Sequence, residues 1–139
     1  MYKRIIYTSR AVASIQLRDV YDIIRVSHNR NSSSRITGGI LFLDGYFIQL
    51  LEGASHSIAE RYERILQDKR HIDIEMRFEE SSNEILFPND WMALRDISQI
   101  DPAILQLYDY QIGLPKHAFS GNQIADFLRA CFAIEPALT

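Results

Sequence analysis

Residues 40–51, Ile-Leu-Phe-Leu-Asp-Gly-Tyr-Phe-Ile-Gln-Leu-Leu, decide how this chain folds. Two apolar runs flank Asp44-Gly45, a dipeptide that tolerates positive φ at both central positions of a type I′ turn. The pattern predicts a β-hairpin with strands at 39–43 and 46–51. Both strands are apolar at nearly every position rather than at alternate ones, so we expect both faces of their sheet to be covered.

Three further segments have the composition of strands. Residues 5–8 are β-branched or aromatic, residues 72–80 alternate loosely between apolar and polar, and residues 91–94 predict a short fifth strand.

Two segments have the period of an amphipathic helix. In the first, the apolar face consists of Leu17, Val20, Tyr21 and Ile24. In the second, Ser57 and Glu60 have the spacing of a capping box, which predicts that a helix begins there. The apolar face of this second helix consists of Ile58, Tyr62, Ile65 and Leu66. The resulting order β-α-β-β-α-β is the ferredoxin-like arrangement, an α+β fold with both helices on one sheet face, here with an added fifth strand.

The last third of the chain predicts helices that cover the other sheet face. Asp101 precedes Pro102 as a helix cap, and Ser120 with Gln123 forms another capping box. The apolar residues behind these two starts are Ile104, Leu107, Tyr108, Ile124, Phe127, Leu128 and Cys131. We therefore divide the chain into 1–95, the sheet with its two helices, and 96–139, a C-terminal helical extension. The alternative is that the second face is buried against another subunit.

Composition excludes several classes of protein. The chain has 139 residues, 47% of them hydrophobic and 24% charged, as expected for one globular domain. Its net charge of −3 argues against nucleic-acid and anionic-membrane surfaces. The single cysteine, the lack of a visible signal peptide and the short apolar runs predict a cytoplasmic protein. The four scattered histidines predict no metal site, and there is no phosphate-binding glycine loop.

Three polar residues require an explanation. Strand parity places Gln49 on the same face as Phe47 and Leu51, where an amide without partners costs roughly 1–3 kcal/mol. The first and third strands of a ferredoxin-like sheet are neighbours, so Tyr7 can lie beside Gln49, with its hydroxyl next to the amide. Asn31, just past the first helix, can reach the end of the same cleft. Taken alone, these residues favour the simpler explanation of a satisfied buried polar pair and a capping asparagine, and a functional site is the open alternative.

Four short segments follow one another in order within about residues 2–95. They are Ile5-Ile6-Tyr7-Thr8-Ser9-Arg10, Asn31 with Ile36-Thr37-Gly38, Phe47-Ile48-Gln49-Leu50-Leu51-Glu52-Gly53, and Asp68-Lys69-Arg70-His71. Together they resemble the BLUF family of blue-light receptors that use FAD. Taken without that resemblance, the last segment is typical of a solvated helix end that complements the helix dipole.

The resemblance implies an oxidised FAD between the two helices. It implies that Tyr7 is the electron donor to the photoexcited flavin, that Gln49 lies between Tyr7 and the ring, and that Asn31 binds the carbonyl edge of the ring. The same resemblance implies further cofactor contacts, from the apolar side chains of Ile23, Ile24 and Ile65, and from Arg64 at the pyrimidine edge or the phosphates.

One departure from the family pattern concerns the fifth strand. The family usually shows Trp-x-Met there, whereas Asp90, Trp91 and Met92 are contiguous in this chain. Counted without a gap, Met92 takes the methionine position, and we expect it to contact the flavin and to relay the signal together with Trp91. A shift of one residue reverses the face to which a strand side chain points.

The resemblance implies a short, stand-alone photoreceptor rather than an enzyme. We expect the altered hydrogen bond at Gln49 to shift the fifth strand and the tail helices, changing the interface of a homo-oligomer or of a downstream protein partner, with no nucleic acid or membrane involved. Three alternatives use the same fold. They are an interaction or oligomerisation module without a chromophore, an acylphosphatase-like hydrolase whose Arg10 lacks a glycine-rich loop, and an RNA-binding sheet, which the negative charge disfavours.

Overall fold

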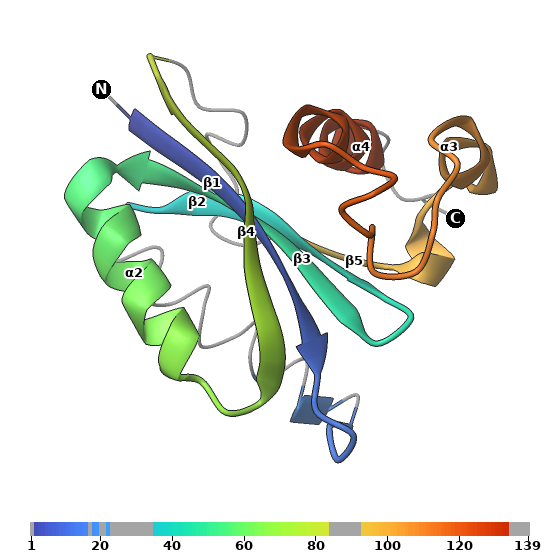
Figure 1. Ribbon diagram of the computed structural model, residues 1–139, viewed down its shortest axis with the longest axis horizontal. Helices are drawn as coiled ribbons and strands as arrows, with labels where there is room; N and C mark the ends of the chain where they lie inside the picture. Colours follow the sequence, from blue (N-terminus) through green and yellow to red (C-terminus); the bar gives the residue numbers. More distant parts are fainter. Residues whose placement is uncertain (1, 17, 20–21, 23–34, 84–92, 134–139) are drawn as a thin grey trace.

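The computed structural model describes residues 2–16, 18–19, 22, 35–83 and 93–133. In these ranges a five-stranded sheet carries α2 on one face and the tail helices α3 and α4 on the opposite face (Figure 1). The strands are β1 (Tyr2–Ala11), β2 (Thr37–Leu43), β3 (Tyr46–Ala54), β4 (His71–Ser82) and β5 (Ala93–Asp96). The helices are α2 (Ser55–Gln67), α3 (Pro102–Leu107) and α4 (Gly121–Ala133), with a 3-10 turn at Ile97–Gln99.

The turn at Asp44-Gly45 sets the register of the two central strands. Asp44 has φ 53° and Gly45 has φ 84°, as the type I′ turn requires. From this turn β2 and β3 pair antiparallel as far as Thr37 opposite Glu52. The predicted hairpin is confirmed, and both strands are longer than predicted.

The strand order is β4-β1-β3-β2-β5. β1 lies between β3 and β4 and is antiparallel to both, which confirms the ferredoxin-like order. The first strand was predicted at 5–8, but its ladder with β3 runs from Tyr2 to Arg10. β5 pairs parallel with β2 and spans 93–96 rather than 91–94. Leu17, Val20, Tyr21 and Ile24, which define the predicted first helix, lie outside the described residues.

The predicted start of α2 is wrong. The helix begins at Ser55, and its N-cap is Ala54, which makes no side-chain capping hydrogen bond. β3 continues to Ala54 and passes directly into the helix, so no loop precedes Ser57 in which that residue could act as a cap. Ser57 and Glu60 therefore lie inside α2 rather than at its boundary.

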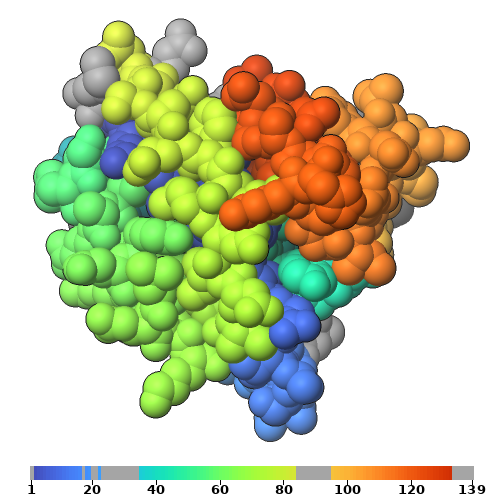
Figure 2. All heavy atoms as spheres, viewed as in Figure 1, coloured from blue at the N-terminus to red at the C-terminus, as the bar shows by residue number. Residues whose placement is uncertain are grey.

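Strand alternation divides the core into two clusters, one on each sheet face. The α2-side cluster consists of Ile5, Tyr7, Ile36, Ile40, Phe47, Leu51 and Ile58. The tail-side cluster consists of Ile6, Leu41, Leu43, Ile48, Leu50, Ile100, Ile104, Leu114, Phe119, Ile124, Phe127, Leu128 and Cys131. Figure 2 shows β4 in yellow-green between α2 and the tail. The expectation that both faces are covered, the second by the tail, is confirmed.

Local side-chain bonds fix the tail helices as predicted. The Asp101 carboxylate accepts a hydrogen bond from the Ala103 amide at 2.9 Å, capping α3. The Gln123 side chain accepts from the Ser120 amide at 2.7 Å, and the Ser120 hydroxyl accepts from the Gln123 amide at 3.2 Å. This reciprocal pair is the predicted capping box.

One tail residue departs from its predicted position. Leu107 was expected on the packing face of its helix, but α3 ends at this residue and its side chain is 78% exposed. Cys131 is buried, as expected of a structural thiol, and burial raises its pKa to about 12.

Two polar contacts attach the loop between α3 and α4 to the sheet. The Tyr110 hydroxyl donates to the carboxylate of Asp44 in the hairpin turn at 2.6 Å. The Arg77 guanidinium on β4 donates to the Phe119 carbonyl at 3.2 Å. The tail is therefore held at two separate strands and not only by apolar packing.

Candidate functional site

A hydrogen-bonded pair of polar side chains lies within the α2-side cluster. Tyr7 on β1 is directly opposite Gln49 on β3 in the strand register. The Tyr7 hydroxyl donates to Gln49 Oε1. Both residues are buried, Tyr7 with 3% and Gln49 with 5% of its surface exposed. The adjacency predicted from strand parity is confirmed.

Aromatic rings and an acidic group surround this pair. The Tyr62 ring lies 6.0 Å from the Tyr7 ring, centroid to centroid, and the His71 ring lies 6.2 Å from it in an edge arrangement. Burial raises the pKa of Tyr7 well above its usual value, and the negative charge of Asp68 raises it further. The Tyr7 hydroxyl is therefore protonated near neutral pH and is available as a hydrogen-bond donor.

His71 is a site residue that the sequence analysis placed wrongly at a solvated helix end. Its Nε2 lies 2.9 Å from the Ile65 carbonyl oxygen, which can only accept, so Nε2 carries the proton. In the neutral ring Nδ1 is then the acceptor for the Ser9 hydroxyl at 2.7 Å. His71 thus joins the end of α2 to β1 beside Tyr7. The sequence could have indicated this role, because His71 directly precedes the predicted strand at 72–80, and a residue at the start of a strand can turn its ring toward the sheet.

Lys69 and Arg70, which precede His71, are exposed at the end of α2, as predicted for a solvated helix end. Asp68 and Arg70 form an ion pair at 2.6 Å at the end of α2. Hydrogen bonding to Arg70 lowers the pKa of the Asp68 carboxyl. The Arg70 guanidinium also lies within the electrostatic influence of Asp19 and Asp22, so acidic and basic groups meet at this edge of the site.

Two predicted cofactor contacts on α2 fall on different surfaces. Ile65 is half-buried and packs against the α2-side cluster. Arg64 is exposed and pairs with Glu60 at 3.0 Å. A hollow of about 40 Å³ opens beside Arg64, and its lining consists of Ile36, Ser57, Glu60, Arg61 and Arg64.

Five residues with predicted roles lie outside the described part of the chain. They are Ile23, Ile24, Asn31, Trp91 and Met92. Of the predicted site, the structure therefore brings together Tyr7, Gln49 and Ile65, and it adds His71.

The described residues fit a planar heteroaromatic ring with a polar edge. The cluster consists of apolar and aromatic side chains, and among them Gln49 presents an amide that carries both a donor and an acceptor. Thr37 is 3% exposed, and its buried Oγ1 has no hydrogen-bond partner among the described residues. In the strand register Thr37 is opposite Glu52 and lies on the tail-side face of the sheet, so this hydroxyl does not belong to the site around Tyr7 and Gln49.

A family model matches this chain over residues 2–93, and its description is "Sensors of blue-light using FAD". The match covers well over half of the chain, which therefore belongs to the BLUF family of blue-light sensors. Photoactivated adenylate cyclase subunit beta of Euglena gracilis is 34% identical over 85 residues, which are 61% of this chain and 10% of that protein. The chain thus spans about a tenth of the length of this curated relative.

Two solved structures have the same fold over nearly the whole chain. BlsA in its photo-activated state has a TM-score of 0.86 at 22% identity and covers 100% of both chains. BlrB in its dark state has a TM-score of 0.79 at 24% identity and covers 95% of both chains. At these identities the likeness establishes the α+β fold, tail helices included.

The described ranges contain neither a metal site nor a membrane-spanning helix. No group of three or more His, Cys, Asp or Glu side chains there is placed to hold a metal ion. No helix in the same ranges has the length and apolar character needed to cross a membrane.

Proposed function

We propose that this chain binds FAD and acts as a blue-light photoreceptor whose light-dependent state depends on the orientation of the Gln49 side chain. The observation that carries the proposal is the buried hydrogen bond from Tyr7 to Gln49. The choice of FAD among flavins is supported by the family description. A bound flavin would supply the absorption of blue light and a one-electron acceptor.

Tyr7 has the properties of a reversible donor. Its hydroxyl is buried, keeps its proton, and has the Gln49 oxygen as a hydrogen-bond acceptor. We propose that Tyr7 gives up an electron and this proton after illumination and then regains both. The cycle changes no bond permanently and consumes no substrate, so we propose that the chain is a sensor and catalyses no reaction.

Gln49 has the properties of a two-state element. Its amide carries an acceptor oxygen and a donor nitrogen at one end of the side chain. A rotation or a change of tautomer exchanges the group that faces Tyr7, and each arrangement leaves a different hydrogen-bond pattern around the pair. In a buried site of low dielectric constant such a difference carries more energy than it would in water.

We propose that the remaining predicted contacts hold the cofactor. Ile65 belongs to the apolar wall, and Ile23, Ile24, Asn31 and Met92 would contribute from the parts of the chain that the structure does not describe. Arg64 would neutralise a phosphate of FAD beside the small hollow that it borders together with Arg61. An exposed guanidinium group suits that role because phosphates remain partly hydrated.

The route by which the signal leaves the site follows the strand register. Gln49 on β3 is opposite Ile40 on β2, and Ile40 is opposite Leu94 on β5. One residue earlier on β2, a Cβ built on Gly39 would come within 2.8 Å of the Phe132 ring of α4. The Arg95 guanidinium of β5 lies 5.4 Å from the centroid of the same ring. We therefore propose that Phe132 couples β2 and β5 to α4, downstream of the expected relay through Trp91 and Met92.

The receiver of the signal is proposed to be another copy of this chain or a separate protein. The Euglena relative is named as a cyclase subunit, and this chain corresponds to only a tenth of it. We further propose that 1–95 is the flavin-binding unit, that 96–139 is the output extension, and that the protein works in the cytoplasm without a nucleic-acid or membrane partner.

The decisive experiment is absorption spectroscopy of the purified protein. We expect a yellow protein whose flavin spectrum shifts under blue light and recovers in the dark. Tyr7→Phe should keep the flavin and lose the shift, because it removes the hydroxyl and retains the ring. Tyr62→Phe is the matched control and should keep both. A colourless protein that does not take up added FAD would contradict the proposal, and loss of flavin from Tyr7→Phe would make Tyr7 structural.

Two variants test the finer assignments. Arg64→Ala should weaken binding of FAD about tenfold and leave riboflavin, which has no phosphate, unaffected; equal effects on both flavins would contradict a phosphate contact. Phe132→Ala should retain the spectral shift and abolish light-dependent changes in amide hydrogen exchange of α4. Arg129→Ala, on the exposed surface of α4, is the control for both. Undiminished exchange changes in Phe132→Ala would contradict the proposed route.

A further inference from the structure

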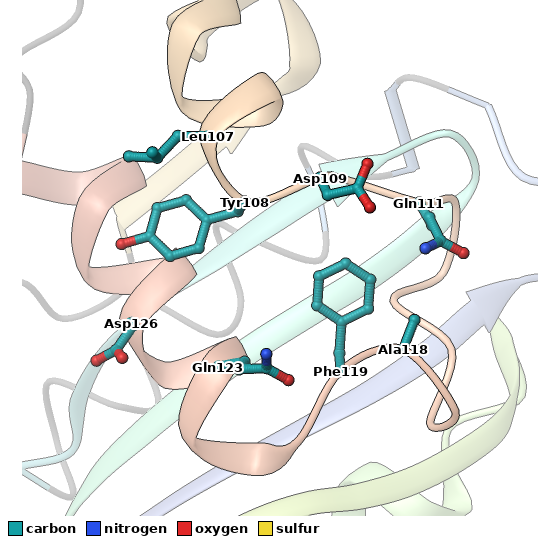
Figure 3. Close-up of a pocket in the computed structure, with 8 residues that line it drawn as sticks. All are labelled: Leu107, Tyr108, Asp109, Gln111, Ala118, Phe119, Gln123 and Asp126. Carbon is teal, nitrogen blue, oxygen red and sulfur yellow. The ribbon is translucent and has the colours of Figure 1, made fainter.

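A hollow of about 410 Å³ lies on the outer side of the tail, between the end of α3 and the first half of α4 (Figure 3). It is on the tail side of the sheet, away from the Tyr7 and Gln49 pair on the α2 side. The residues that line it are Leu107, Tyr108, Asp109, Gln111, Ala118, Phe119, Gln123 and Asp126. None of the roles assigned to the light-sensing site uses these residues.

Two aromatic rings form a fixed wall of this hollow. Phe119 is 4% exposed and belongs to the tail-side cluster. Tyr108 is half-buried, and its ring lies edge-on to the buried Phe127 ring with centroids 5.6 Å apart. Both rings are thus held by the core before any ligand arrives. Aromatic rings at the edge of a hollow attract cations and accommodate aliphatic chains.

The charges around the hollow all have the same sign. Figure 3 shows the Asp109 and Asp126 carboxylates on opposite sides, with the two rings between them. The lining contains no basic side chain. The turn that carries Asp109 is fixed by backbone bonds, from Asp109 N to Gln106 O at 3.1 Å and from Tyr110 N to Leu105 O at 2.9 Å. A cationic group in the hollow would therefore meet a carboxylate on either side.

The surface next to the hollow favours a protein over a small free cation. Leu107 and Ile112 are the most exposed of the large apolar side chains in the described ranges, at 78% and 62%. Leu107 lines the hollow, where a free cation would leave it in water and a protein partner would cover it. Lysine and arginine combine an aliphatic stem with a charged end, which matches apolar residues beside carboxylates.

We propose that this hollow receives a lysine or arginine side chain from a basic segment of a partner protein, with an apolar neighbour of that side chain resting on Leu107. The proposal goes beyond light sensing, because the binding itself requires no flavin. It names the chemistry by which a downstream protein would recognise the tail.

The test is an NMR titration of the full-length protein in the dark. The probe is an acetylated, amidated pentapeptide with a central arginine flanked by leucines, and the matched peptide carries citrulline, the neutral analogue of arginine. We expect the arginine peptide to shift the amide signals of residues 107–126 and the citrulline peptide to bind at least tenfold more weakly. The double variant Asp109→Asn, Asp126→Asn should bind the arginine peptide about tenfold more weakly, and the control Glu63→Gln on α2 should bind it as the original protein does.

Three outcomes would overturn the proposal. The first is that the peptide shifts signals elsewhere in the protein. The second is that binding is unchanged in the double variant while its spectrum shows an intact fold. The third is that methylguanidine alone binds as tightly as the peptide, which would make the hollow a site for small cations. None of these outcomes depends on whether the protein is yellow or responds to light, so failure here is distinguishable from failure of the proposed function.

Discussion

The α2 side and the tail side of the sheet are packed with the same aliphatic residue types, but they place their polar groups differently. On the tail side, Arg4 and Glu52 form a buried ion pair at 2.9 Å near the end of their strands. On the α2 side, Tyr7 and Gln49 form a neutral pair in the middle of the cluster. An ion pair has one favourable arrangement, whereas a hydroxyl and an amide have two. Under the proposed function, the α2 side therefore carries the pair that changes state, and the tail side carries a fixed pair of charges.

The largest effect is expected on the tail side. Phe127 is fully buried and contacts the rings of Tyr108 and Tyr110. Phe127→Ala should lower the free energy of unfolding by about 3–5 kcal/mol, through lost burial and the cavity left behind. Chemical denaturation measures this change. The control Leu107→Ala, which is exposed at the end of α3, should stay within about 0.5 kcal/mol. A small loss in Phe127→Ala would mean that the tail contributes little to the core.

A smaller effect with strong coupling is expected on the α2 side. Gln49→Leu leaves the Tyr7 hydroxyl buried without its acceptor, which should cost about 1–3 kcal/mol of stability in the flavin-free protein. Adding Tyr7→Phe removes the unpaired hydroxyl and should recover much of that loss. A double-mutant cycle by denaturation measures the coupling. Strictly additive effects would show that the two side chains do not depend on each other.

Thr37, on the tail-side face of β2, offers a prediction that separates the two faces. Its buried hydroxyl has no partner among the described residues, so Thr37→Val should leave the flavin-free protein unchanged or stabilise it by up to about 1 kcal/mol. The same change should leave flavin binding unaffected, because Thr37 lies on the sheet face opposite the Tyr7 and Gln49 pair. Thermal unfolding with and without FAD measures both. Destabilisation of the flavin-free protein would instead reveal a partner within the chain.

The smallest effect is expected from the ion pair at the end of α2. Arg70 lowers the pKa of Asp68, so the folded state binds this proton less readily than the unfolded state does. The resulting stability is present above the ordinary carboxyl pKa and is lost as the pH falls through the lowered one. Asp68→Asn should therefore reduce stability by at most about 1 kcal/mol at neutral pH and by progressively less as the pH falls through the lowered pKa. Unfolding curves between pH 2 and 7 measure this difference, and an equal deficit at both ends would exclude the pair as its cause.

Sequence patterns predicted those features that depend on neighbours in the chain. The hairpin follows from Asp44-Gly45, the tail caps follow from Asp101 and Ser120, and strand parity placed Gln49 on the same face as Phe47 and Leu51. Parity and capping are local, so a single sequence contains them.

Features that depend on where one element ends and the next begins could not be predicted in the same way. Ser57 has the spacing of a cap, but β3 passes directly into α2 and takes away that role. His71 follows a charged helix end and looks solvated until β4 begins at that residue and turns its ring inward. Leu107 has helical spacing, but its helix stops there. In each case tertiary packing, rather than local preference, set the boundary.

The contact between Gly39 and Phe132 has a practical consequence for anyone who wishes to fuse this sensor to a reporter. The Phe132 ring of α4 lies where Gly39 of β2 has no side chain, so we expect that a fusion which keeps this contact has to extend past the family match and include residue 132. A fusion that ends at β5 would remove α3 and α4 and expose the apolar tail side of the sheet. The fused protein would then have to cover that face and replace the Phe132 ring.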